Sequence, residues 1–224
     1  MHPLDNPAWA ALCTSQQHLA KGQGLALRYD GDFGAFAAVP NHSEAPLEAL
    51  GALVSRFGTT IVLEKHRLPP VPGTIAEKHR MGVQMVAEDP VPPDPDFAFV
   101  ALGDADAPEM LALATLTEPG PFFARTHQLG RFIGIRRDGE LVAMAGERMR
   151  THGYTEVSGV CTHPDFRGFG LAGKLMRAVA AGIVAAGDVP FLHAYADNAS
   201  AIALYERLGY RHRIDVNVTV LAPA

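Results

Sequence analysis

The stretch Asp165–Leu175, with the sequence DFRGFGLAGKL, holds the residues whose spacing most directly suggests chemistry. Gly168, Gly170 and Gly173 fit the pattern G-x-G-x-x-G, and Gly168, Gly173 and Lys174 fit G-x-x-x-x-G-K. Both patterns expose backbone amides at the start of a helix, where the helix dipole favours an anion. Each glycine costs about 1 kcal/mol of helix propensity relative to alanine, so a segment that only formed a helix would not need three of them. The stretch therefore predicts a phosphate-binding turn.

The two glycine patterns predict different nucleotides, and each fits the rest of the chain poorly. A P-loop needs Ser or Thr after its lysine to hold magnesium, and the chain has Leu175 there. A dinucleotide-binding fold carries its glycines at the first strand, but here only one helix and one strand follow Asp197, the residue that would hold the ribose. A helix start without a ligand is the third alternative. All three stay open on the local sequence alone.

The composition argues against several classes of function. The chain has 224 residues, 48% of them hydrophobic, and a formal net charge of −5, which argues against nucleic-acid binding through overall charge. Its two cysteines, Cys13 and Cys161, form neither a disulfide framework nor a zinc pattern. We see no signal peptide and no apolar run of membrane length. We therefore expect a cytoplasmic protein without a metal, a membrane or a nucleic-acid partner.

Prolines divide the chain into two parts. Residues 89–96 lie in a proline-rich segment, and because proline removes backbone donors and interrupts helices, we expect an extended linker there. Residues 1–88 alternate short helices and strands, with a helix expected at 6–22 and a strand at 82–88, and form an N-terminal α/β region of unknown role. Residues 97–224 form the second domain, which contains the glycine turn.

The second domain supplies the elements that must position the turn. Hydrophobic periodicity predicts the order β-α-β-β-β-α-β-α-β, with an Asp138-Gly139 hairpin turn between the second and third strands. The turn is expected to follow a strand at 154–162 and to open a helix at 168–187. The next strand is expected at 190–196. This order predicts an α/β (α+β) protein with a mixed sheet and helices on its faces.

Two motifs in this domain resemble those of the GNAT N-acetyltransferase superfamily. Residues 160–176, VCTHPDFRGFGLAGKLM, resemble its motif A, Gln/Arg-x-x-Gly-x-Gly/Ala, at Arg167, Gly170 and Ala172. Residues 196–210, ADNASAIALYERLGY, resemble a second motif, Asn-x-x-Ala-x-x-Leu-Tyr-x-x-x-Gly-Phe/Tyr. The two motifs are separated by one helix and one strand. The resemblance covers about residues 97–220 and looks closest to the glycine N-acyltransferase-like branch.

The resemblance implies a fold and an activity. The fold would be a GNAT-like acyltransferase sheet with a splayed strand pair, and in that branch the smaller N-terminal half can be a degenerate GNAT-like unit. The activity would be acetyl-CoA-dependent N-acetylation of a primary amine by direct attack, without a metal. The alternative is a non-catalytic acyl-CoA-binding or regulatory module. The acceptor would be a small molecule or a peptide, and because dimers are frequent in this superfamily, a homodimer is compatible with the resemblance.

The resemblance also assigns the residues that would bind coenzyme A. Amides of the turn would hold its pyrophosphate, and the backbone of the strand before the turn would pair with its pantetheine arm, as in strand addition. Asn198, the expected N-cap of the following helix, and Tyr205 would lie near the cofactor. The full set is Val160, Cys161, Thr162, Arg167, Gly168, Phe169, Gly170, Leu171, Ala172, Gly173, Lys174, Asn198 and Tyr205.

Three side chains are candidates for the catalytic steps. Tyr205 matches the family tyrosine that faces the sulfur, where its hydroxyl would donate a hydrogen bond to the departing thiolate; the alternative is that it only packs in the core. Glu156 and His193 are candidates for the general base, although each fits a structural strand position slightly better, and a chain of water molecules could also serve. The thiol of Cys161 is expected to be buried rather than nucleophilic.

The loop Thr117–Gly130 lies where the family covers its acceptor groove. Phe122, Phe123 and Arg125 in this loop could line that groove. The sequence does not identify the acceptor amine.

Overall fold

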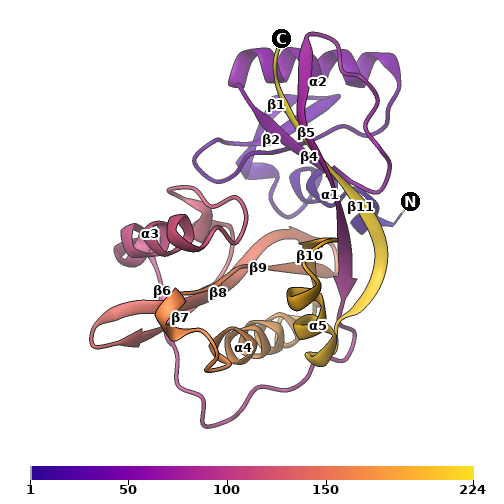
Figure 1. Ribbon diagram of the computed structural model, residues 1–224. Helices are drawn as coiled ribbons and strands as arrows, with labels where there is room; N and C mark the ends of the chain where they lie inside the picture. The colour runs from indigo at the N-terminus through magenta and orange to yellow at the C-terminus, as the bar shows by residue number, and fades with distance from the viewer. Residues whose placement is uncertain (1) are drawn as a thin grey trace.

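The computed structural model describes residues 2–224, whose strands form one continuous sheet in the order β1-β2-β3-β4-β11-β5-β10-β9-β8-β7-β6 (Figure 1). The strands are β1 (Ala20–Gln23), β2 (Ala26–Tyr29), β3 (Phe36–Ala38), β4 (Thr60–Glu64), β5 (Thr74–Val86), β6 (Val100–Leu102), β7 (Phe132–Arg137), β8 (Glu140–Thr151), β9 (Tyr154–Thr162), β10 (Val189–Tyr195) and β11 (Arg211–Pro223). The α-helices are α1 (Pro7–Cys13), α2 (Glu44–Phe57), α3 (Ala107–Thr117), α4 (Leu171–Ala185) and α5 (Ala199–Arg207). Short 3₁₀ turns are η1 (Pro3–Asp5), η2 (Gln17–Leu19), η3 (Asp104–Asp106), η4 (Thr126–Leu129) and η5 (Pro164–Phe166).

Two long strands, β5 and β11, join the two halves of the chain. Each has 13 residues, and they pair antiparallel along their whole length. On its other edge β5 pairs with β10 over Gly82–Val86, while β11 pairs with β4. Figure 1 shows both strands running from the upper lobe into the lower one. A strand from the first 88 residues therefore lies inside the sheet of the second half.

The proline-rich segment 89–96 contains no helix or strand, in keeping with the predicted extended linker. It is attached to the second half through Val91, whose N–H donates to the carbonyl of Leu208 at 3.0 Å. The division into domains at this segment stays a prediction, because the sheet itself continues across it through β5.

Helices cover both faces of the lower part of the sheet. α4 packs on one face, where Leu175, Met176 and Ile183 are buried with Val157 and Leu192. α3 lies on the opposite face (Figure 1). On that side, near β8, β9 and β10, α1 packs against buried residues from both halves of the chain, namely Leu4, Tyr29, Met149 and Phe191. These helices hold β9 and β10 in place from both faces of the sheet.

β9 and β10 separate after a short parallel ladder. They pair only over Tyr154–Glu156 and Val189–Phe191. A break in register between β8 and β9 places an extra residue near Gly159, whose φ of 61° lies in the left-handed region that favours glycine. The predicted mixed sheet with a splayed strand pair is thereby confirmed.

Some expected elements differ in length. The helix expected from residue 6 to residue 22 ends at Cys13, because the Gln16 side chain is buried and donates to the carbonyls of Leu129 and Arg148. β5 begins at Thr74, well before the expected residue 82, since its exposed first part is held by pairing with β11 rather than by a buried face. The hairpin turn has positive φ at Asp138 and Gly139, as expected.

Candidate active site

The glycine turn connects η5 to α4 and leaves its amides without partners. Gly168 has φ 86° and Gly170, the N-cap of α4, has φ 71°, so both need the freedom of glycine. The first backbone bond of the helix runs from the Lys174 N–H to the Gly170 carbonyl, at 3.1 Å. Within residues 2–224, the amides of residues 168–173 donate no hydrogen bond. These amides lie at the positive end of α4 and are available to an anion.

The turn borders a cavity of about 530 Å³ that extends along the end of β9. Both sequence motifs and the end of α3 contribute to its wall. The lining residues are Thr117, Val160, Cys161, Thr162, Phe166, Arg167, Gly168, Gly170, Leu171, Ala172, Gly173, Ser200, Leu204 and Arg207. The structure thus brings together most of the residues expected to hold coenzyme A.

The remaining expected cofactor residues lie outside this lining. The Phe169 side chain is 69% exposed. The Lys174 ammonium lies 5.5 Å from the centre of the Phe97 ring. Asn198 caps α5 as expected, its side-chain oxygen accepting from the Ala201 N–H at 3.2 Å. Their contacts with a cofactor stay predictions.

The lining includes residues that the sequence argument did not assign to the cofactor, among them Ser200 and Arg207, and the bulge of β9 was also missed. Ser200 and Arg207 share one face of α5 with Leu204, and this i, i+4, i+7 spacing was the signal that could have placed them. Arg207 adds a second cation to the wall that holds Arg167. Gly159 gave only the weak signal of a glycine inside a strand.

Tyr205 lies on α5 beside the cavity rather than in its lining. It packs against the core formed by α4 and β10, and its ring lies 6.3 Å from that of Tyr210. Burial raises the pKa of the Tyr205 hydroxyl, so this group is a proton-bearing hydrogen-bond donor at neutral pH. The buried Tyr210 hydroxyl has no hydrogen-bond partner within the described chain.

Glu156 and His193, the two candidate bases, contact each other. The Glu156 carboxylate is fully buried and accepts from Arg148 Nε at 2.8 Å and Nη2 at 2.6 Å. The Nδ1 atom of His193 lies 2.7 Å from the same carboxylate. Burial alone would raise the pKa of Glu156, but the Arg148 charge and these hydrogen bonds lower it to about 2. Glu156 is therefore an ionised partner of Arg148 and a very weak base.

Cys161 is buried, as expected. It is 6% exposed, and burial raises the pKa of its thiol to about 11. Since the thiolate is the nucleophile, this side chain is almost entirely in its unreactive form at neutral pH.

The loop Thr117–Gly130 spans the space between the bulge of β9 and the N-terminal half. The Phe122 ring packs edge-on against Phe132 at 5.7 Å, next to Gly159. The Arg125 N–H donates to the carbonyl of Asp32, and its guanidinium lies over the Phe33 ring. The N–H of Phe123 donates to the Thr126 hydroxyl at 2.8 Å. Phe122 thus lies at the bulge, whereas Arg125 is engaged by the N-terminal half; an acceptor-binding role for the loop stays a prediction.

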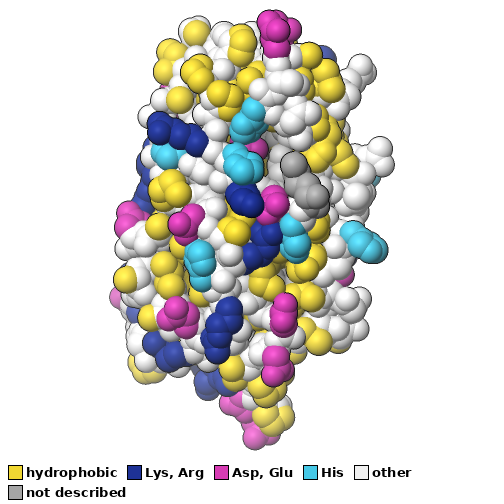
Figure 2. Space-filling view, turned by 90° about the vertical axis from the view of Figure 1, so that its right-hand side faces the viewer, with side chains coloured by type: hydrophobic (Ala, Val, Ile, Leu, Met, Phe, Trp, Pro, Cys, Tyr) yellow, Lys and Arg dark blue, Asp and Glu magenta, His cyan; other side chains and the backbone are white. Residues whose placement is uncertain are grey.

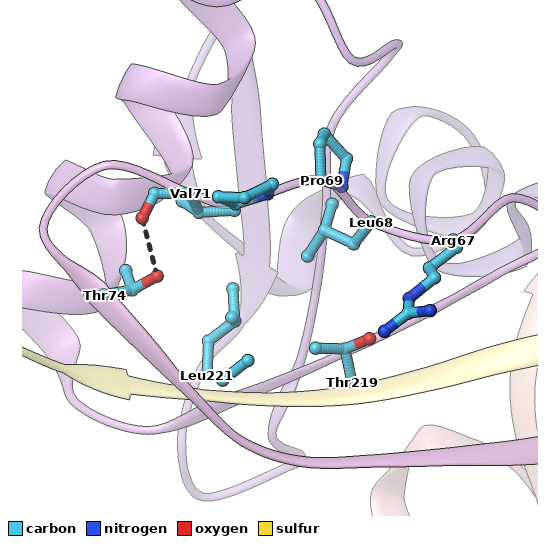
Figure 3. A pocket seen from close by; sticks show the side chains of 9 residues that line it. Arg67, Leu68, Pro69, Val71, Thr74, Thr219 and Leu221 are labelled. Atoms are coloured by element: carbon cyan, nitrogen blue, oxygen red, sulfur yellow. Dashed lines mark hydrogen bonds between the residues drawn. The ribbon is translucent and has the colours of Figure 1, made fainter.

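Other surfaces offer less chemistry. A cavity of about 520 Å³ in the N-terminal half has largely apolar walls from Leu68, Val71 and Leu221, with Arg67 and Thr74 at its edge (Figure 3). The face that carries β11 mixes acidic, basic and histidine side chains without a continuous patch of one sign (Figure 2). Among residues 2–224, no three His, Cys, Asp or Glu side chains are grouped to hold a metal, and no helix is long and apolar enough to cross a membrane.

Comparisons with known proteins agree with this geometry. Residues 132–220 match the family model of FR47-like proteins. A structure from Novosphingobium aromaticivorans, described as belonging to the GNAT family of acetyltransferases, is 46% identical, with 100% of each chain covered and a TM-score of 0.94. No curated protein sequence matches the chain.

More distant structures share the fold. A GCN5-related N-acetyltransferase from Kribbella flavida is 20% identical, with 96% of this chain and 95% of that chain covered and a TM-score of 0.63. A GNAT-family acetyltransferase from Colwellia psychrerythraea is 12% identical, with 95% and 89% covered and a TM-score of 0.56. With its free turn amides, its splayed strands and its full-length relative, the chain belongs to the GNAT family of acetyltransferases.

Proposed function

We propose that the protein is an acetyl-CoA-dependent N-acetyltransferase that transfers the acetyl group to a primary amine by direct attack. The observation that supports this most strongly is the set of partnerless amides at residues 168–173, which open onto a cavity that follows β9 into the splay. Such a row of amides at a helix start fits a pyrophosphate. Acetyl-CoA, when bound, supplies a thioester whose carbonyl carbon an amine can attack.

The described residues fit this co-substrate in two further ways. Arg167 and Arg207 line the cavity beside the turn and place positive charge near a phosphate in a chain whose net charge is −5. Beyond Glu156, the edge of β9 on the β10 side is not paired with β10. The backbone of Val160–Thr162 is therefore free on that edge to pair with the amides of a pantetheine arm.

The chain's own residues then act as follows in the proposed reaction. The Tyr205 hydroxyl, with its raised pKa, donates a hydrogen bond to the departing thiolate. Neither candidate base is free to take the proton of the acceptor amine, because Glu156 is engaged by Arg148 and both ring nitrogens of His193 lie within hydrogen-bond distance of protein groups. The amine therefore loses its proton to water. A closer relation to the glycine N-acyltransferase-like branch is part of the same proposal.

The test is a binding and turnover experiment with the purified chain. We expect acetyl-CoA, but not ATP or NAD, to raise the thermal midpoint, since only a ligand that binds the folded state stabilises it. Release of free thiol would then be followed against small amines, amino acids and peptides. Binding without turnover on any acceptor would favour a non-catalytic acyl-CoA-binding module, and no effect of acetyl-CoA on stability would contradict the proposal.

Tyr205 can be tested separately. Replacing Tyr205 with Phe removes one hydroxyl and keeps the ring that packs beside Tyr210. We expect kcat to fall at least about tenfold, because a donor that acts on developing charge contributes to the transition state rather than to binding. The dissociation constant of acetyl-CoA, measured by titration calorimetry, should change little. A variant with wild-type kcat would remove Tyr205 from the mechanism.

A further inference from the structure

A side-chain hydrogen bond bridges β9 and β10 where their backbone ladder stops. Glu156 and Phe191 form the last strand pair. His193, two residues further along β10, directs its Nδ1 back to the Glu156 carboxylate at 2.7 Å. Both side chains are almost completely removed from solvent, at 0% and 6% exposed. The bond therefore lies at the fork from which the two strands diverge.

Gln84 of β5 determines which ring nitrogen of His193 carries the hydrogen. The Gln84 oxygen accepts from Arg213 Nη1 at 2.8 Å, and its nitrogen donates to the carbonyl of Leu4 at 2.8 Å. Arginine can only donate and a carbonyl can only accept, so the amide has one possible orientation. The Gln84 nitrogen then faces His193 Nε2 at 3.0 Å, and this ring nitrogen must accept. The hydrogen of the imidazole lies on Nδ1, from which it is donated to Glu156.

The resulting chain of hydrogen bonds crosses four adjacent strands. It runs from Arg148 on β8 through Glu156 and His193 to Gln84 on β5. The charged groups facing the imidazole are Glu156 and, behind it, Arg148; Gln84 and the edge-on Phe191 ring occupy its other sides. His193 has no lone pair free to take a proton from an amine while this chain is intact.

We infer that His193, in its Nδ1–H tautomer, is a positioning residue that clamps the fork of β9 and β10 and so fixes the width of the slot between them. This inference rests on the proposed function, because the slot is where the pantetheine arm is placed. Loss of the clamp lets the fork relax and weakens the pairing of the arm with β9. The clamp therefore acts on acetyl-CoA affinity, whereas a general base would act on kcat and its pH dependence.

Two variants separate these roles. In His193→Asn the amide nitrogen takes the place of Nδ1 and can still donate to Glu156, but the side chain has no basic atom. In His193→Leu the donor is lost. If His193 is a clamp, we expect the His193→Asn variant to keep the acetyl-CoA dissociation constant within about threefold of the wild type. This variant should also keep most of kcat and the same pH–rate profile. The His193→Leu variant should raise the dissociation constant at least about tenfold. Folding of both variants is checked by circular dichroism.

Opposite results would overturn the clamp. If His193→Asn lost at least about a hundredfold in kcat together with one limb of the pH–rate profile, while binding acetyl-CoA normally, His193 would be the base. If His193→Leu folded and bound acetyl-CoA like the wild type, the fork would not need it. The ¹⁵N shifts of the wild-type imidazole test the tautomer directly and without turnover: Nδ1–H supports the inference and Nε2–H contradicts it. Failure of the wild type to bind acetyl-CoA would instead refute the proposed function.

Discussion

Ala172→Asp should strongly weaken acetyl-CoA binding without weakening the fold. Ala172 lies in the first turn of α4 and lines the cavity next to the partnerless amides. A carboxylate there stabilises the positive end of the helix, by about 0.3–1 kcal/mol, so the free energy of unfolding should stay equal or rise. The same charge repels a pyrophosphate and competes for its amides. We expect the affinity for acetyl-CoA to fall at least about a hundredfold, a loss of about 2.7 kcal/mol.

A matched control places the same charge at the other end of the same helix. Ala185 is the exposed last residue of α4, where the helix dipole disfavours a carboxylate. Ala185→Asp should leave the affinity for acetyl-CoA within about twofold and lower the unfolding free energy by a few tenths of a kcal/mol. Titration calorimetry and urea unfolding measure the two quantities. An Ala172→Asp protein that bound acetyl-CoA as tightly as the control would show that the phosphate does not lie at this turn.

Glu156→Gln should destabilise the protein strongly although it replaces one atom. The change leaves the buried Arg148 guanidinium without a counter-charge, and removing one partner of a buried ion pair typically costs about 3–5 kcal/mol. For a chain of this size that corresponds to a thermal midpoint lower by about 6–20 °C. The double variant Arg148→Met with Glu156→Leu removes both charges and should recover most of the loss. If the Glu156→Gln variant were as stable as the wild type, the buried Arg148 guanidinium would not need the Glu156 carboxylate as its counter-charge.

The same pair gives the wild type a defined acid sensitivity. The pKa of Glu156 is about 2 in the folded protein and near its ordinary value of 4.5 in the unfolded chain. Because the folded value is the lower one, its contribution to stability is complete above about pH 5 and is lost as the pH falls from about 4.5 to about 2. Urea unfolding at pH 6, 4 and 3 should show this loss in the wild type and a smaller one in the double variant.

The sequence predicts the glycine turn and the cavity wall beside it better than it predicts the loop Thr117–Gly130. The turn, its helix and β9 are local features that glycines, periodicity and alternation predict. The motif resemblance then picks out Arg167, Gly170 and Ala172, which the structure places in one wall of the cavity. The clamp depends on side chains that meet only after folding. Gln84, Arg148 and Arg213 lie far from His193 in sequence, and nothing in their local pattern indicates that they bond to one another. The length of β5 was missed for the same reason, since its exposed part is held by β11.

The shared strand β5 has a consequence for how this protein can change. β5 belongs to residues 1–88, yet it lies in the sheet between β10 and β11, which belong to the last 36 residues of the sequence. A truncated version that began after the prolines would leave β10 with an open edge, would leave β11 without either of its neighbours, β4 and β5, and would lose Gln84 as well. We therefore expect neither portion to fold correctly when it is expressed without the other.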